Sequence, residues 1–360
     1  MRSIESTLDQ LGSVTKLPPR SQTPAIQSSF EFTSGFVAPD YDWDRILVHG
    51  FTYSMTGKTG SGKTAIMQRL MAHVALGRSL AGREIVQGNV LMLAGENPDD
   101  VRMRWIALSE QIGFDLQRIP VAFRPGTCNV AEQMAEIATY AESVGGLRLV
   151  CVDTSAAFFP GDEENNNKEI GDHARTLRSL SDLPGNPTVV ISCHPTKHAR
   201  DDELLPRGGG AFLAEVDGNL AVRQSDGSIE LHWQGKFRGP DFPPMAWECI
   251  TVESDRLVTS RGRRIPTVIA RCLSDQEQAD KAIKSNSELA KLIQSMAQHP
   301  SASVAKLAEA CGWISATGEP MKSKVSRLLF QLKDAKLAEK MLDKWALTAK
   351  GKHVAERGLG

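Results

Sequence analysis

The segment Gly57-Lys-Thr-Gly-Ser-Gly-Lys63-Thr64 constrains the fold of this chain more than any other feature. It matches the pattern G-x-x-x-x-G-K-[S/T], whose glycines let the backbone approach a polyphosphate and turn successive N–H groups inward. A β-prone segment precedes it, and a helical pattern, Lys63–Leu76, follows. Because helix N-termini bind anions, this context predicts a phosphate-binding loop between a strand and a helix.

Each position of this loop has an expected part in holding ATP and Mg²⁺. The ammonium group of Lys63 is expected to reach the β- and γ-phosphates, and the hydroxyl of Thr64 to ligate Mg²⁺. The candidate ATP-binding residues are Gly57, Lys58, Thr59, Gly60, Ser61, Gly62, Lys63 and Thr64.

A second metal-binding group follows later in the chain. The apolar segment Leu147–Val152 ends at Asp153, 90 residues after Lys63. A carboxylate at the end of such a strand is expected to bind Mg²⁺ through water. The alternative is that Asp153 only caps a helix.

Short apolar runs alternate with longer amphipathic stretches between residues 42 and 262. The expected strands are Phe51–Thr56, Asn89–Ala94, Leu147–Val152 and Thr188–Cys193, and the expected helices are Lys63–Leu76, Pro98–Ile112, Val130–Val144 and Lys168–Leu180. This order predicts an α/β fold with a mostly parallel sheet and helices on both faces. Three further strands, Gly218–Val222, Ser228–Trp233 and Ala246–Val252, are expected to extend that sheet or pack beside it.

Hydrolysis requires a group that orients and deprotonates a water molecule. Many ATPases place a glutamate directly after the magnesium aspartate, but Thr154 occupies that position here. Glu96, just after the strand Asn89–Ala94, is the nearest alternative, because the carboxyl ends of parallel strands share one edge of the sheet. We therefore predict that Glu96 is the catalytic base. The alternative is that it only assists the helix start at Asn97.

These features together resemble the RecA-type ATPases. Within that class, the segment Ala94-Gly-Glu-Asn-Pro-Asp-Asp-Val-Arg-Met-Arg104 is similar to plasmid replication helicases of the RepA type and related phage ATPases. The resemblance covers roughly residues 42–252 and implies a ring, hexameric in those helicases, that hydrolyses ATP and acts on DNA.

The resemblance also implies further site residues. His194, in the segment Val189–Lys197, is similar in place to a histidine that senses the γ-phosphate. The basic pair Lys236 and Arg238 is similar to one that reaches the ATP site of a neighbouring subunit. The alternatives are a strand-end histidine without a role and a basic turn in solvent.

The loop before the glycine-rich segment Arg207–Gly210 corresponds to the part of such rings that contacts single-stranded DNA in the central pore. The candidate phosphate contacts there are Lys197, His198, Arg200 and Arg207. The first strand departs from the family pattern, because Thr52–Thr56 is unusually polar. We therefore assign no residues to the adenine pocket from the sequence.

The C-terminal part is more basic than the rest. Residues 285–360 carry 12 Lys+Arg and 7 Asp+Glu, a net charge of +5, so the remainder carries −6. Three expected helices, Ser287–Gln298, Ser303–Ala310 and Pro320–Ala335, and a hairpin, Leu337–Leu347, resemble a winged helix-turn-helix. This implies contacts to duplex DNA, for which Ser323, Lys324 and Arg327 are candidates. Protein docking and simple packing are the alternatives.

Four segments are therefore expected: a disordered tail over residues 1–40, a RecA-like ATPase domain over 41–262, a linker over 263–284 and a winged-helix-like domain over 285–360. No apolar run approaches the roughly 20 residues that span a bilayer. The N-terminus lacks the apolar block of a signal peptide, so we expect a cytoplasmic protein without a membrane partner.

The leading hypothesis is an ATP-driven helicase ring for plasmid or phage replication, with DNA and further copies of the chain as partners. Two alternatives stay open. One is a RecA-like ATPase that loads or remodels replication or recombination proteins without unwinding. The other is a winged-helix regulator for which ATP is only a switch, although a switch needs no catalytic base.

Overall fold

The computed structural model describes residues 26–161, 166–196, 199–225, 228–274, 277–278, 287–315, 318–341 and 344–356. The chain divides into two units, Met1–Asp40 and Tyr41–Gly360. In the first unit, Ser29–Thr33 forms the short helix α1, which starts with a capping box between Ser28 and Glu31. The sequence analysis did not predict this helix, and residues 1–25 of the expected tail lie outside the described residues.

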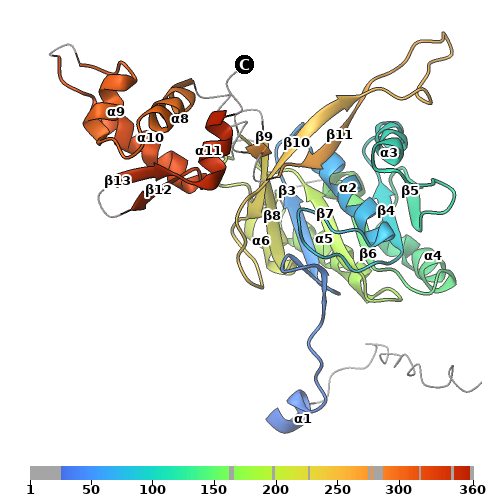
Figure 1. Ribbon diagram of the computed structural model, residues 1–360. Coiled ribbons are helices and arrows are strands. Elements are labelled where there is room, and N and C mark those ends of the chain that lie inside the picture. Colours follow the sequence, from blue (N-terminus) through green and yellow to red (C-terminus); the bar gives the residue numbers. More distant parts are fainter. Residues whose placement is uncertain are drawn as a thin grey trace, which may run out of the picture. The chain divides into compact units, whose positions relative to one another are not determined.

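The second unit is built on a nine-stranded sheet with the order β11-β10-β9-β8-β3-β7-β6-β4-β5 (Figure 1). The strands are β3 (Thr52–Thr56), β4 (Val90–Ala94), β5 (Val121–Pro125), β6 (Leu149–Asp153), β7 (Thr188–Cys193), β8 (Gly218–Ser225), β9 (Ser228–Trp233), β10 (Met245–Val252) and β11 (Thr267–Cys272). The strands from β8 to β5 are parallel, whereas β9, β10 and β11 are antiparallel. The predicted α/β fold with a mostly parallel sheet is therefore confirmed.

Helices cover both faces of this sheet because its central strands are apolar on both sides. In β4, Val90 and Met92 join the core beneath α2 and α3, while Leu91 and Leu93 join the core on the opposite face. The helices of the first face are α2 (Lys63–Leu76) and α3 (Pro98–Ile112); those of the second are α4 (Val130–Ser143), α5 (Asn167–Arg178) and α6 (Gly209–Glu215). The shorter elements are β1 (Tyr41–Trp43), β2 (Leu47–Val48) and the 3₁₀ turns η2 (Ser155–Phe158) and η3 (Ser179–Asp182).

Two strands correct the sequence analysis. Strand β11 lies inside the segment 263–284 that was expected to be a linker, and it pairs with β10 from Thr267 to Cys272. An edge strand needs only one apolar face, so polar residues such as Arg271 are tolerated in it. The sequence of this segment therefore did not show a clear strand pattern. Strand β5, the opposite edge, was also missed, since Val121–Pro125 is short and its residues are only partly buried.

The polar sequence of β3 is explained by one side chain of β8. Asn219 is fully buried, and its Oδ1 accepts hydrogen bonds from Ser54 Oγ at 2.8 Å and Thr56 Oγ1 at 2.7 Å. Its Nδ2 donates to the carbonyls of Leu204 and Gln234. All four hydrogen-bonding positions of the amide are thus used, which makes polar residues stable in a central strand.

The C-terminal residues form a separate hydrophobic core. Its elements are α8 (Ser287–Gln298), α9 (Val304–Ala310), α10 (Lys322–Asp334), the hairpin of β12 (Ala338–Met341) and β13 (Lys344–Leu347), and α11 (Ala349–Glu356). The amphipathic pattern of α10 buries Val325, Leu328, Leu329 and Leu332 in this core. Among the described residues, no helix combines the length and hydropathy that a membrane crossing requires.

We expect Asn219→Ala to lower the free energy of unfolding by about 3 kcal/mol or more, because it removes a hydrogen-bond partner from two buried hydroxyls and two backbone carbonyls. Urea denaturation of the purified chain measures this change. The control is Gln111→Ala, which removes an exposed amide from α3 and should change stability by less than about 0.5 kcal/mol. Equal stability of the two variants would contradict the role given to Asn219.

Candidate functional site

The phosphate loop joins the end of β3 to the start of α2, at the carboxyl edge of the parallel strands. Gly60 and Gly62 have φ angles of +77° and +92°, a region that side chains other than glycine rarely adopt. A Cβ on Gly57 would lie 2.5 Å from Ser61 Oγ and 2.7 Å from the Val222 carbonyl. The loop therefore requires glycine at all three positions of the sequence motif.

Lys63 lies inside the loop and is 5% exposed. Its Nζ donates to the carbonyls of Gly57 at 2.7 Å and Lys58 at 3.1 Å. Burial lowers the pKa of this ammonium group, and the nearby Asp153 carboxylate opposes the shift. The ammonium is thus held against the backbone of the loop that is expected to bind phosphate.

Thr64 and Asp153 meet, as the sequence analysis expected of two magnesium ligands. Thr64 Oγ1 donates to Asp153 Oδ2 at 2.8 Å, although 89 positions separate them in the chain. Asp153 is 2% exposed, and its Oδ1 has no hydrogen-bond partner within the described part of the chain. Burial raises the pKa of this carboxyl, an effect that a cation would offset. A hydroxyl and a buried carboxylate oxygen are the hard ligands that Mg²⁺ prefers.

Glu96 and His194 lie at the same edge of the sheet. Glu96 follows β4, His194 follows β7, and His194 Nε2 is 3.9 Å from Glu96 Oε1. The backbone N–H of Gly95 donates to the Asp153 carbonyl at 2.8 Å, which joins the ends of β4 and β6. Glu96 is half-exposed, so water reaches it. The expected base and the expected γ-phosphate sensor are therefore neighbours at the edge of the sheet where Asp153 lies.

The loop after β7 is closed by a bridge between Pro195 and Pro206. Within it, Asp201 Oδ1 lies 2.8 Å from Nζ of Lys58, a residue of the phosphate loop. Of the expected DNA contacts, Arg200 is exposed and pairs with Asp202, whereas Lys197 and His198 lie outside the described residues.

Arg207, the other expected DNA contact of this loop, lines a cavity of about 30 Å³ together with His194. That volume holds two or three water molecules by the usual criterion of about 10–15 Å³ each. The cavity is also lined by His173 of α5, whose Nε2 lies 3.1 Å from Ser155 Oγ. Sequence reasoning missed His173 and Ser155, because no spacing relates them to the loop.

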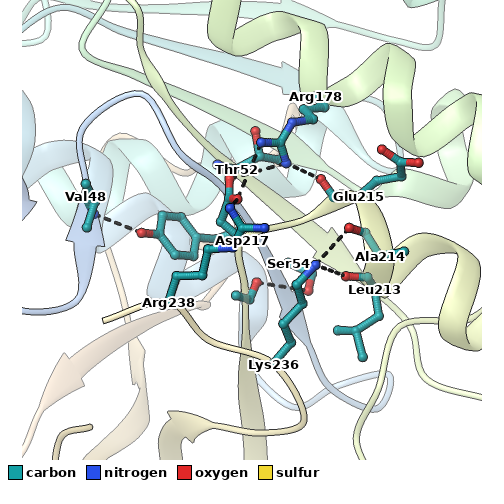
Figure 2. Close-up of polar contacts among 12 residues, drawn as sticks. Val48, Thr52, Ser54, Arg178, Leu213, Ala214, Glu215, Asp217, Lys236 and Arg238 are labelled. Atoms are coloured by element: carbon teal, nitrogen blue, oxygen red, sulfur yellow. Dashed lines mark hydrogen bonds and ion pairs between the residues drawn. The ribbon is translucent and has the colours of Figure 1, made fainter. Parts of the chain in front are cut away.

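Lys236 and Arg238 lie beside the end of α6 and beside Asp217 (Figure 2). Lys236 Nζ donates to the carbonyls of Leu213 and Ala214, at the end of α6. Arg238 pairs at 3.3 Å with Asp217, whose buried carboxylate also accepts the N–H of Thr52 at 3.0 Å.

Thr52 begins β3, and the phosphate loop follows the other end of that strand. The two ends are separated by roughly 13 Å of strand. Arg178 also approaches the Asp217 carboxylate, at 3.3 Å.

The three candidate DNA contacts of the C-terminal part, Ser323, Lys324 and Arg327, differ in their surroundings. Lys324 pairs with Glu288 and lies over the Trp313 ring, 4.8 Å from its centroid. Arg327, one turn along α10, is exposed, as are Lys322 and Ser323. The exposed face of α10 is thus basic at its N-terminal half.

We expect Thr64→Val to weaken Mg²⁺-dependent ATP binding by about tenfold or more, because it removes a metal ligand and leaves the loop backbone unchanged. Isothermal titration with and without excess EDTA separates the magnesium-dependent part. Ser61→Ala, in the same loop, is the control and should keep that dependence. An unchanged magnesium effect in Thr64→Val would remove Thr64 from the metal site.

A comparison with protein-family models agrees with this geometry. A family model described as an AAA domain matches residues 18–200, a little more than half of the 360 residues. The matched region contains the phosphate loop, Glu96, Asp153 and His194. No curated protein matches the chain. The chain therefore belongs to the AAA-domain family, and it is an ATPase of the P-loop type.

Proposed function

We propose that this protein is a ring-forming, ATP-driven motor that acts on DNA, specifically a replicative helicase of plasmid or phage type. In this proposal Lys63 and the loop amides hold the triphosphate, and Thr64 and Asp153 hold Mg²⁺. The metal ion, when bound, neutralises charge on the β- and γ-phosphates. Glu96 accepts a proton from the attacking water, and His194 donates a hydrogen bond to the γ-phosphate or to that water.

The observation that carries the proposal is the link between the nucleotide site and the loop after β7. That loop starts at His194, beside Glu96, and is joined to the phosphate loop by the ion pair of Lys58 with Asp201. A change of nucleotide state therefore acts on this loop at His194 and at Asp201, on either side of Arg200. Such coupling is what a motor needs in order to move DNA.

The place of Lys236 and Arg238 supports a ring. Arg238 pairs with Asp217 at the end of β3 that is remote from its own phosphate loop, and Lys236 Nζ is bound to carbonyls at the end of α6. We therefore expect any part of this pair in hydrolysis to be at the site of a second chain. A guanidinium supplied by a neighbour stabilises the charge on the transferring phosphate and makes hydrolysis depend on assembly. Duplex DNA is assigned to the basic face of α10, in a winged-helix arrangement of the C-terminal elements.

A forked-duplex assay tests this function. We expect single-stranded DNA to stimulate ATP turnover and the wild-type chain to displace the strand. Lys63→Ala should lose both activities. Glu96→Gln should bind ATP but lower kcat by about 10²-fold or more, because it removes the base. Asp99→Asn, an exposed carboxylate in the first turn of α3, is the control and should retain both activities.

Two outcomes would favour the alternatives. Turnover that DNA stimulates without strand displacement indicates an ATPase that loads or remodels replication proteins. ATP binding without turnover indicates a DNA-binding regulator for which the nucleotide is a switch.

We further expect Arg238→Ala to bind ATP but to lose about 10³-fold or more in turnover. Mixing it with Lys63→Ala should restore activity, because one subunit then supplies the intact loop and the other the arginine. Arg178→Ala, which loses a contact to the same Asp217 carboxylate, is the matched control and should keep turnover. Absence of complementation in the mixture would show that Arg238 acts within one chain or not at all.

A further inference from the structure

Strand β3, which leads into the phosphate loop, has neighbouring strands on both sides in the sheet. On one side β7 and β6 follow β3, and they bring His194 and Asp153 to the loop. On the other side lie β8, β9 and β10. Because the terminal phosphate belongs beside Asp153 and Glu96, the opposite end of a bound nucleotide lies toward β8–β10. That end carries the ribose and the base.

Sheet register places four side chains of these strands on one face. Gln224 of β8 pairs with Ile229 of β9, and Ile229 pairs with Trp247 of β10. Directly paired residues of antiparallel strands point to the same face, and so does Cys249, two positions beyond Trp247. Ile229 and Trp247 belong to the core beneath α2, so this face is the one from which the phosphate loop rises.

Two of these side chains touch the loop. A Cβ on Gly62 would lie 2.8 Å from Ile229 Cδ1 and 2.9 Å from Cys249 Sγ. Ile229 is 5% exposed, whereas Cys249 is exposed. The sulfur of the exposed Cys249, backed by the buried Ile229 side chain, makes an apolar wall on which an aromatic base can stack.

Gln224 adds a polar group beside this wall. Its Nε2 donates to the Gly60 carbonyl at 3.1 Å. Because that carbonyl can only accept, the contact fixes the amide so that Oε1 remains the acceptor on this side chain. The exocyclic amine of adenine is a hydrogen-bond donor, whereas the corresponding oxygen of guanine is an acceptor.

We propose that Gln224, Ile229 and Cys249 form the base-binding surface of the nucleotide site and select adenine over guanine. The proposal rests on the proposed function, since it assumes that the loop holds a nucleoside triphosphate. Ile229 and Cys249 support the ring, and the Gln224 carbonyl accepts from the adenine amine.

Equilibrium binding of ATP, GTP and inorganic tripolyphosphate with Mg²⁺ tests the selection, with the full chain. We expect the wild type to bind ATP about tenfold or more tightly than GTP. Gln224→Leu should bring the two affinities close together and leave tripolyphosphate binding unchanged. Gln117→Leu, which replaces an exposed amide between α3 and β5, is the control and should keep the preference for ATP.

Thiol labelling of the wild-type chain tests whether the base of a bound nucleotide covers Cys249. The rate of N-ethylmaleimide modification at Cys249 is measured by peptide mass, with Cys128, which is partly buried, as the internal reference. We expect ATP to slow modification of Cys249 about tenfold or more, as it fills the site, and tripolyphosphate to have little effect. Modification of Cys128 should stay constant.

The outcomes separate this inference from the proposed function. If tripolyphosphate does not bind the wild type, or if Lys63→Ala binds it equally well, the phosphate site itself is wrong. If tripolyphosphate binds through Lys63 but ATP does not protect Cys249 from modification, Ile229 and Cys249 do not form the base-binding surface. Equal ATP and GTP affinities in the wild type, or an unchanged ratio in Gln224→Leu, overturn the selection by Gln224.

Discussion

The hydrogen bond from Thr64 to Asp153 joins the two parts of the nucleotide site, and the rest of the site depends on it. Thr64 begins α2 after the phosphate loop, and Asp153 ends β6, two strands away from β3 in the sheet. The carboxylate is buried with one oxygen unpaired among the described residues. An arrangement of this kind costs stability without a cation, because a buried carboxylate loses its hydration. The protein thus retains an incompletely bonded carboxylate where the proposed function places the metal.

Polar groups in the centre of the sheet connect this site to the loop after β7. The hydroxyls of Ser54 and Thr56 meet on Asn219, and Asn219 donates to the Leu204 carbonyl in that loop. The same loop pairs with Lys58 through Asp201. The strand that leads into the phosphate loop and the segment assigned to DNA therefore share a fully bonded network. A movement of either one has to break or rearrange these hydrogen bonds.

The two ends of β3 divide the chemistry between subunits in the proposed ring. The carboxyl end leads into the phosphate loop, and the amino end carries Asp217 with its two arginines. Asp217 keeps the Thr52 amide and Arg178 when Arg238 turns away, so a buried charge is not left without partners. Breaking the ion pair of Arg238 should therefore cost less free energy than breaking an isolated buried ion pair.

The sequence by itself determined the elements with strong local signals: helices Lys63–Leu76 and Pro98–Ile112, strand Thr188–Cys193 and the phosphate loop. It also indicated that Glu96 and Asp153 share one edge, because parallel strands align their carboxyl ends. The partners of β11, the role of Asn219 and the approach of Gln224, Ile229 and Cys249 to the phosphate loop became clear only from the three-dimensional fold. These depend on contacts between segments far apart in the chain, and such contacts leave no periodic pattern in a single sequence.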